Sequence, residues 1–198
     1  MELIDAIYNR RAVRDYTEQS VPKLSVLELI DAATQAPSAI NSQPWAFVVV
    51  QDRDRLKEYS DRAKACLLKT IEPTSSLFAH RDMLTDPNFN IFYNAGTLVI
   101  ICAKPDGLNP AEDCCLAAQN FMLAAHAIGL GTCPIGFARP WLNLPEAKKE
   151  LGIPANYTPV FPIIVGFPTG QTAPPERKEP EIVTWNPPGE NNPDVTRL

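Results

Sequence analysis

The sequence is poor in groups that bind metals. It has only two histidines, His80 and His126, and its five cysteines include no C-x-x-C pair. This scarcity argues against a metal site, because structural zinc needs closely spaced Cys and His ligands. An odd number of unpaired cysteines is typical of reduced thiols, so we expect a cytoplasmic protein.

Other absences exclude further classes of protein. No apolar run approaches the roughly 18 residues that a membrane span needs, and the acidic, amphipathic residues 1–5 are unlike a secretory signal. The net charge of −5 argues against a nucleic-acid partner. The chain has no internal repeat, and it has no Gly-x-Gly-x-x-Gly pattern that would predict a Rossmann site.

The length and the prolines predict the domain organisation. With 198 residues, 45% of them apolar, the chain can bury one sizeable core, which we expect within residues 1–170. Its 20 prolines are about twice the usual share and gather in the last third. Residues 171–198 cannot form a core, so they either dangle or lie extended on another surface.

The stretch from Pro37 to Trp45 has the composition of a stiff recognition loop. Pro37 and Pro44 restrict the backbone at each end, and hydroxyl and amide side chains lie between them. Such a loop suits a neutral, hydrogen-bonding ligand edge. The alternative is an ordinary connection between a helix and a strand, since Ser, Asn and Pro are common in turns.

Three arginines within residues 10–14 follow a short amphipathic helix. They are either solvated surface charge near a helix end or a cradle for an anion, because guanidinium groups match phosphate. In an acidic protein, so dense a basic cluster favours phosphate. If the segment is extended, Arg10, Ala12 and Arg14 share one side.

Periodicity and turn signals predict the other elements. We expect helices at residues 2–9, 26–36, 53–70, 110–128 and 145–151, and strands at 45–50, 97–103 and 160–167. Ser25 and Glu28 form a capping-box pattern before the second helix. Pro162 predicts an edge or bulged position for the last strand. Residues 71–94 lack periodicity, so they are either a lid over a flat ligand or a loop packed on the core.

The helix at 110–128 is apolar nearly all round, so it must be buried. One domain of this size has limited room to surround it, and burial against a second copy is a natural solution. His126 on this helix is interpreted as a core histidine in preference to a ligand. After it, Gly136 would allow backbone to approach a ligand closely, although a plain turn is the alternative.

Four segments, in order and over nearly the whole chain, resemble motifs of the nitroreductase family of FMN-dependent oxidoreductases. They are Arg-Arg-Ala-Val-Arg-Asp-Tyr at 10–16, Ala-Pro-Ser-Ala-Ile-Asn-Ser-Gln-Pro-Trp at 36–45, Gly-Leu-Gly-Thr-Cys-Pro-Ile-Gly at 129–136, and Gly-Phe-Pro at 166–168 with Pro-Pro-Glu-Arg-Lys at 174–178. In one departure, Ala12 stands where many members have Ser.

The resemblance implies an α+β fold with a central mixed β-sheet flanked by helices, in an intertwined homodimer. It implies that the long helix forms the subunit interface, that residues 171–198 reach over the partner, and that two FMN molecules lie between the chains. The phosphate and ribityl chain would contact Arg10, Arg11, Arg14 and Arg177. The partner's loop would line the isoalloxazine with Pro37, Ser38, Ala39 and Asn41. The backbone of Ile135 and Gly136 would approach the reactive nitrogen, and the implied set also includes Ala12, Gln43 and Pro134.

The implied activity is that of an FMN-dependent NAD(P)H oxidoreductase. NADH or NADPH would pass hydride to the flavin, and a nitroaromatic, quinone or similar electron-poor acceptor would then receive it in a ping-pong cycle. The sequence offers no convincing acid–base pair, which agrees with chemistry carried by a cofactor. Two alternatives stay open: an FMN-binding module without redox turnover, and an interaction protein whose arginines bind an acidic partner.

Overall fold

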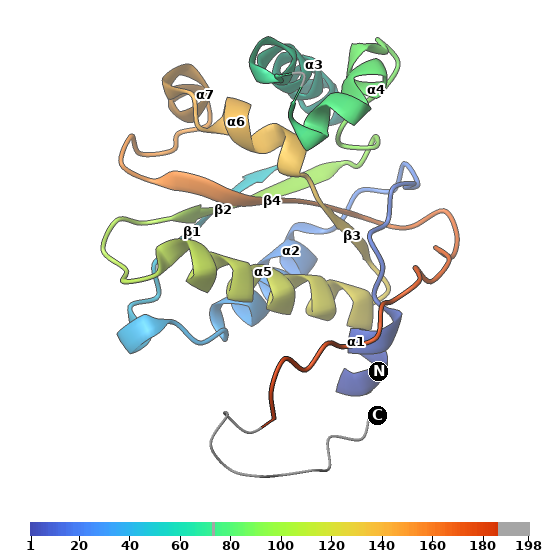
Figure 1. The fold of residues 1–198 in the computed structure, drawn as a ribbon, viewed down its shortest axis with the longest axis vertical. Coiled ribbons are helices and arrows are strands. Elements are labelled where there is room, and N and C mark those ends of the chain that lie inside the picture. Colours follow the sequence, from blue (N-terminus) through green and yellow to red (C-terminus); the bar gives the residue numbers. More distant parts are fainter. Residues whose placement is uncertain (73, 186–198) are drawn as a thin grey trace.

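A four-stranded sheet lies at the centre of the computed structural model, which describes residues 1–72 and 74–185 (Figure 1). The strands are β1 (Trp45–Val50), β2 (Thr97–Ala103), β3 (Gly131–Pro134) and β4 (Thr158–Gly166), in the order β1-β2-β4-β3. All neighbouring pairs are antiparallel. The expectation of a mixed sheet is therefore wrong for the described strands. The parallel contact of the N-terminal segment is a single isolated bridge, between Ala12 and Thr132, and does not make a strand of the sheet.

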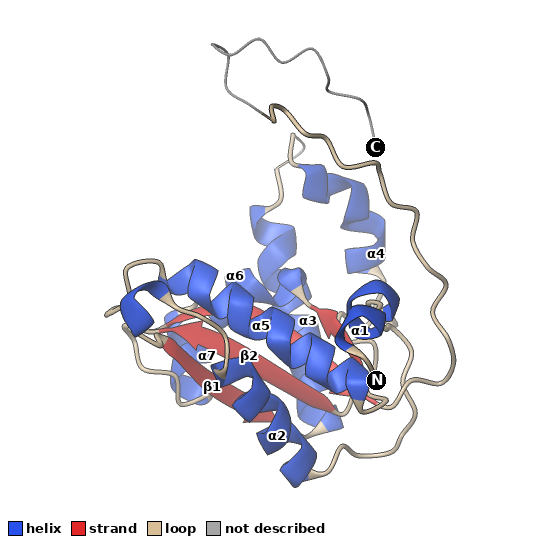
Figure 2. Ribbon diagram, turned by 90° about the horizontal axis from the view of Figure 1, so that it is seen from below, coloured by secondary structure: helices blue, strands red, loops and turns tan. Residues whose placement is uncertain are grey.

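Helices cover both faces of the sheet (Figures 1 and 2). One face carries α2 (Lys23–Thr34) and α5 (Pro110–Ala127), with α1 (Leu3–Asn9) beside α5. The other carries α3 (Arg53–Thr70), α4 (Arg81–Thr85), α6 (Arg139–Leu142) and α7 (Pro145–Glu150). Short 3₁₀ helices occur at Ala39–Asn41, Ser76–His80 and Gly136–Ala138. The expected helices are confirmed, but the capping box before α2 is wrong. That helix starts earlier, after Pro22, whose φ of −58° already suits a helix start.

Strand β2 separates two hydrophobic layers. Its side chains alternate: Leu98 and Ile100 join the layer under α3, while Val99 and Ile101 join the layer under α2 and α5. Every residue of β2 is buried. The strand thus reads as one continuous apolar run because helices cover both of its faces.

Helix α5 is buried on one side only. Phe121 is fully buried within the chain, whereas Leu116 is 47% exposed and Ile128 is 52% exposed. The neighbouring α1 exposes Leu3 and Ile4 as well. The burial all round expected for this helix is therefore not reached within a single chain, and the burial against a second copy expected from the sequence stays a prediction.

The last strand, β4, lies in the middle of the sheet, so the edge position expected from Pro162 is wrong. The alternative, a bulge, is present. Pairing with β2 shifts between Ile101 and Cys102, whose partners are Phe161 and Pro159, so Val160 has no partner on β2. Pro162 lies outside this bulge and pairs with Ile100. Its carbonyl oxygen accepts from the Ile135 N–H on the side away from β2, where β3 pairs only with residues 163–166, so its missing N–H interrupts no strand pairing.

The expected lid region, residues 71–94, is divided in its packing. Phe92 is fully buried in the core, whereas Leu77, Phe78 and His80 are exposed. Buried Lys64 of α3 donates hydrogen bonds to the carbonyl oxygens of Asp86 (3.1 Å) and Phe89 (2.7 Å), which fixes the far end of the region. No helix of the described residues is long and apolar enough to cross a membrane.

We expect Phe121→Ala to lower the free energy of unfolding by about 3–5 kcal/mol, because it opens a cavity where α5 packs on the sheet. The exposed Gln119→Ala on the same helix should change it by less than about 0.5 kcal/mol. Chemical denaturation measures both. Equal effects would contradict the orientation of α5 described above.

Candidate functional site

The arginine-rich segment 10–14 runs along β3 at the edge of the sheet. The Val13 N–H donates to the carbonyl oxygen of Thr132 at 2.9 Å, one residue from the bridge at Ala12. Gly131 permits this approach, since an added Cβ would lie 2.7 Å from Cγ2 of Val13. The extended segment expected from the sequence is thus present, and the missing side chain of Gly131 lets it lie close to β3.

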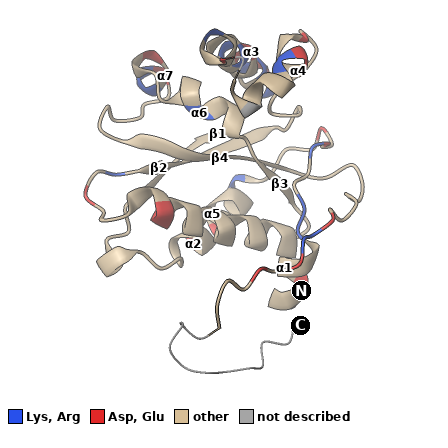
Figure 3. Cartoon of the chain, viewed as in Figure 1, with Lys and Arg blue, Asp and Glu red and all other residues tan. Residues whose placement is uncertain are grey.

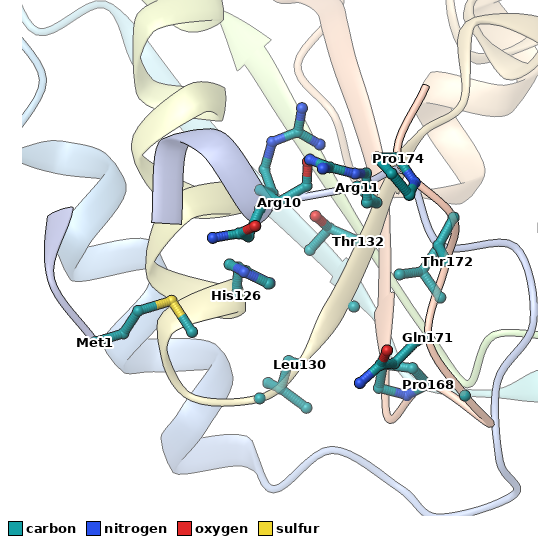
Figure 4. Close-up of a pocket in the computed structure, with 15 residues that line it drawn as sticks. Met1, Arg10, Arg11, His126, Leu130, Thr132, Pro168, Gln171, Thr172 and Pro174 are labelled. Carbon is teal, nitrogen blue, oxygen red and sulfur yellow. The ribbon is translucent and has the colours of Figure 1, made fainter. Parts of the chain in front are cut away.

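Two of these arginines line a pocket of about 590 Å³ between the end of α5 and the segment after β4 (Figure 4). Arg11 donates to the carbonyl oxygens of Tyr8 (2.6 Å) and Arg10 (3.0 Å). Burial lowers the pKa of Arg10, and the positive charges of Arg177 and Arg11 lower it further. Arg10 and Arg11 line the pocket, and Arg177 is near enough for its charge to act on Arg10 (Figure 3 shows the basic segment after α1). None of the three has an ion-pair partner within the described residues.

His126 lies in the same pocket, beside Arg10 (Figure 4). Its Nε2 atom is buried and has no hydrogen-bond partner among the described residues. Burial lowers the pKa of the imidazole, and Arg10 and Arg11 lower it further. The interpretation as a core histidine therefore missed its place in the pocket. The available signal was its position in the last turn of α5, just before the glycine-rich segment 129–136.

Arg14 faces a different hollow. It lines a second pocket of about 590 Å³ with Pro134, Ile135 and Gly136. Ile135 is buried, whereas Gly136 is exposed, and an added Cβ at Gly136 would meet no atom within 4 Å. Arg10 and Arg14 are thus assigned to separate hollows along β3, although both belong to one short segment. Backbone at Gly136 is open to a flat ligand.

The loop at 37–43 has a strained and heavily bonded backbone. Ile40, Asn41 and Gln43 adopt positive φ values of 50°, 56° and 46°, which are uncommon for residues other than glycine. The Gln43 N–H donates to Ser38 Oγ at 2.9 Å, and the Gln43 side-chain amide donates to Asn41 Oδ1 at 3.0 Å. Such strain persists only where the surroundings fix it, and it concentrates at functional sites.

A buried carboxylate attaches this loop to α5. The Ala39 N–H lies 3.2 Å from Oδ1 and 3.3 Å from Oδ2 of Asp113, which is only 4% exposed. Asp113 lies in the first turn of α5, where a negative charge is also favoured by the helix dipole.

The two halves of the expected site therefore lie at opposite ends of one helix. The loop is attached at Asp113, while His126 and the arginines meet at the other end; thirteen residues of helix separate them by about 20 Å. Figure 1 shows the 3₁₀ turn at Ala39–Asn41 and helix α1 at the two ends of α5. A ligand would have to span about that length to contact both the loop and the arginine pocket of one chain.

Comparisons with known proteins agree with this architecture. The model of the nitroreductase family matches residues 7–167. An FMN reductase [NAD(P)H] of Bacillus subtilis is 28% identical over 191 residues, which cover 92% of this chain and 72% of that protein. The crystal structure of a nitroreductase with bound FMN from Bacteroides fragilis superposes with a TM-score of 0.80 at 25% identity, over 94% of this chain and all of that one. An FMN-dependent nitroreductase of Clostridium difficile gives a TM-score of 0.72 at 27% identity, over 93% and 98% of the two chains.

The class of protein follows from the fold and the site: an α+β protein whose sheet edge carries unpaired guanidinium groups next to open backbone. The chain belongs to the nitroreductase family. The resemblance read from the four sequence motifs is confirmed, and with it the expectation of an oxidoreductase.

We expect Gly131→Ala to lower the free energy of unfolding by about 1–3 kcal/mol, the usual cost of an extra carbon in a packed site. The new Cβ would collide with Val13 and push the arginine segment off β3. Gly136→Ala, which meets no neighbour, is the matched control and should cost less than about 0.5 kcal/mol. Similar losses in both variants, measured by urea unfolding, would contradict this packing.

We expect the ligand-free protein to lose stability as the pH falls below the ordinary His pKa of 6.5. The folded state holds the pKa of His126 below that value, so the unfolded chain binds the proton first and gains population. His126→Gln should reduce this loss between pH 7 and pH 5, as followed by thermal unfolding. An unchanged pH dependence in the variant would show that His126 does not titrate as described.

Proposed function

We propose that the protein is an FMN-dependent NAD(P)H oxidoreductase that reduces nitroaromatics, quinones or similar electron-poor acceptors. Membership of the nitroreductase family supports the reaction class, and related structures containing FMN support the cofactor. The relative from Bacillus subtilis, an FMN reductase [NAD(P)H], supports the nicotinamide co-substrate. The chain's five cysteines, all free, agree with the cytoplasmic location expected from their pattern.

The observation that carries the cofactor assignment is the cluster of Arg10, Arg11 and Arg177 without acidic partners among the described residues. Like charges at close range destabilise each other, and a doubly charged phosphate would relieve that repulsion. The orphaned Nε2 of His126 lies in the same pocket and lacks a partner in the described part of the chain. These groups fit the phosphate end of FMN.

The other expected residues complete the proposed site. Arg14 would stabilise negative charge at the ring, and open backbone at Gly136 would admit the ring edge. The remaining expected ring and ribityl contacts are Ala12, Pro134 and Ile135 from one chain, with Pro37, Ser38, Ala39, Asn41 and Gln43 from the loop. When bound, FMN supplies hydride transfer, first from NAD(P)H and then to the acceptor in a ping-pong cycle. The side chains bind and orient, and none is needed as an acid or base.

The site needs two chains. One chain places its loop and its arginines at opposite ends of α5, so a ligand touching both must lie between two copies. The exposed apolar residues of α1 and α5 supply a surface for such an intertwined homodimer. Residues 171–198 would form an arm on the partner, although residues 186–198 lie outside the described part of the chain.

We expect the purified protein to be yellow and to release FMN on acid treatment. Arg10→Ala should weaken FMN binding by about tenfold or more, because it removes a charge-assisted contact of about 1.5–3 kcal/mol. Arg55→Ala, an exposed arginine on α3 at the other face of the sheet, is the matched control. Equilibrium dialysis measures both affinities.

Steady-state oxidation of NADPH or NADH with a quinone tests the activity itself. Turnover that depends on bound FMN supports an oxidoreductase. A protein that binds FMN but passes no electrons to any acceptor would instead be a flavin-binding module. A colourless protein that takes up no FMN would contradict the proposed cofactor, and unchanged FMN affinity in Arg10→Ala would contradict the proposed site.

A further inference from the structure

The pocket that Arg14 lines is a chamber between the segment after β3 and the lid region. One wall is Pro134 to Phe137 with Arg139 and Pro140, and the other comes from Leu77, His80, Met83, Ile91 and Tyr93. Its volume of about 590 Å³ suits a small organic molecule. The chamber is separate from the arginine pocket of Figure 4, and the two lie along the same edge strand.

The chamber is basic and has no counter-charge of its own. Its described lining includes two arginines, Arg14 and Arg139, but no Asp or Glu. The ion pairs of the described residues lie elsewhere, on α3 and α7. Arg14 lies 5.8 Å over the ring of Tyr93, and its nearest polar partner is the Ala12 carbonyl oxygen at 3.5 Å. Since Arg14 is assigned to the flavin in the proposed function, Arg139 is the cation left for an incoming anion.

The walls between the cations are aromatic and aliphatic. The rings of His80 and Phe137 lie 5.8 Å apart in an edge-to-face arrangement, and the Tyr93 ring makes a similar contact with Phe89 at 5.7 Å. Aromatic faces and edges of this kind accept another flat ring at low cost.

The wall that carries Tyr93 is held rigidly. Tyr93 has a φ of 50°, which is rare for a bulky residue. Its N–H donates to the Asn90 carbonyl oxygen at 2.8 Å, and Arg53 donates to the Asn94 carbonyl oxygen at 2.8 Å. The Ile91 N–H donates to Ser60 Oγ of α3 at 3.0 Å. A strained residue fixed by so many bonds is typical of a position where the side chain has a task.

We propose that the part of this chamber between Arg139 and the lid region, beside the flavin ring, is the acceptor site and that it selects small planar aromatic acids, with Arg139 binding the carboxylate. The proposal rests on the proposed function, because the acceptor must lie beside the ring that Gly136 and Arg14 would contact. Arg139 is the cation of the chamber that the flavin site does not use. Its guanidinium could form a bidentate pair with a carboxylate, which makes the contact directional.

The test compares 4-nitrobenzoate with its uncharged analogue 4-nitrobenzamide on the FMN-loaded protein. The wild type should prefer the acid, and Arg139→Ala should reduce the ratio of the two kcat/KM values by about tenfold. Arg139→Lys should recover part of the ratio, because it restores the charge without the fork. Arg81→Ala on α4, an exposed arginine outside the chamber, should leave the ratio at the wild-type value.

Two further measurements distinguish a change in acceptor binding from a change in flavin reduction by the nicotinamide. Binding of both compounds to the oxidised protein, followed by the flavin absorbance, should show the same loss of preference without any turnover. The rate of flavin reduction by NADH or NADPH, measured without an acceptor, should be the same in the wild type and in Arg139→Ala. An unchanged ratio in Arg139→Ala, or a defect confined to reduction by the nicotinamide, would overturn the proposal. Failure of every acceptor to turn over would reject the proposed function, while the binding ratio would still decide the chamber's selectivity.

Discussion

The packing of α5 against the sheet is the constraint on which the rest of the molecule depends. Small residues such as Ala117, Ala118 and Ala125 are fully buried and let the helix lie close to the strands. At its first turn, Asp113 holds the backbone of the loop at 37–43. At its other end, Gly129 adopts a φ of 82° and the Leu130 N–H donates to the Ala125 carbonyl oxygen at 2.9 Å. This turn directs the chain into β3, and the arginine segment lies along that strand.

The electrostatics of the β3 edge follow from that placement. The arginine segment, the last turn of α5 and the C-terminal segment bring Arg10, His126 and Arg177 into one region from three distant parts of the chain. Without an anion, the repulsion between the arginines raises the free energy of the folded state, in agreement with the lowered pKa of Arg10, and a protonated His126 would add to it. A ligand that supplies negative charge would therefore stabilise the fold as well as bind to it.

The sequence predicted the long elements well and the short ones poorly. α3 and β2 have strong periodicity or a long apolar run, and their bounds agree with the structure. β3 and α6 have four residues each, which is too few to show a period. Pro162 was misleading because β4 is central in the sheet, yet at Pro162 it lies beyond the end of the short β3, where a missing N–H costs no strand pairing. The start of α2 was misplaced because an earlier proline competed with the capping pattern.

The candidate site was also predicted only in part from the sequence. The motif residues could be read from the sequence because each group is local. Their distribution between two hollows could not, since it depends on the register of segment 10–14 with β3. The place of His126 had one signal, its position in the last turn of α5 before the glycine-rich segment, but an apolar helix does not show which side meets a pocket. The split across α5 emerges only when both ends of the helix are seen together.

The central claim is that one flavin site combines the arginines of one chain with the loop of another. A purified heterodimer of Arg10→Glu and Asn41→Pro chains tests it most directly. The first variant reverses a charge in the cluster, and the second cannot adopt the observed φ of 56°. Each homodimer should bind almost no FMN, whereas the heterodimer, with both lesions in one of its sites, should bind about one per dimer. A heterodimer as empty as its parents would contradict the account.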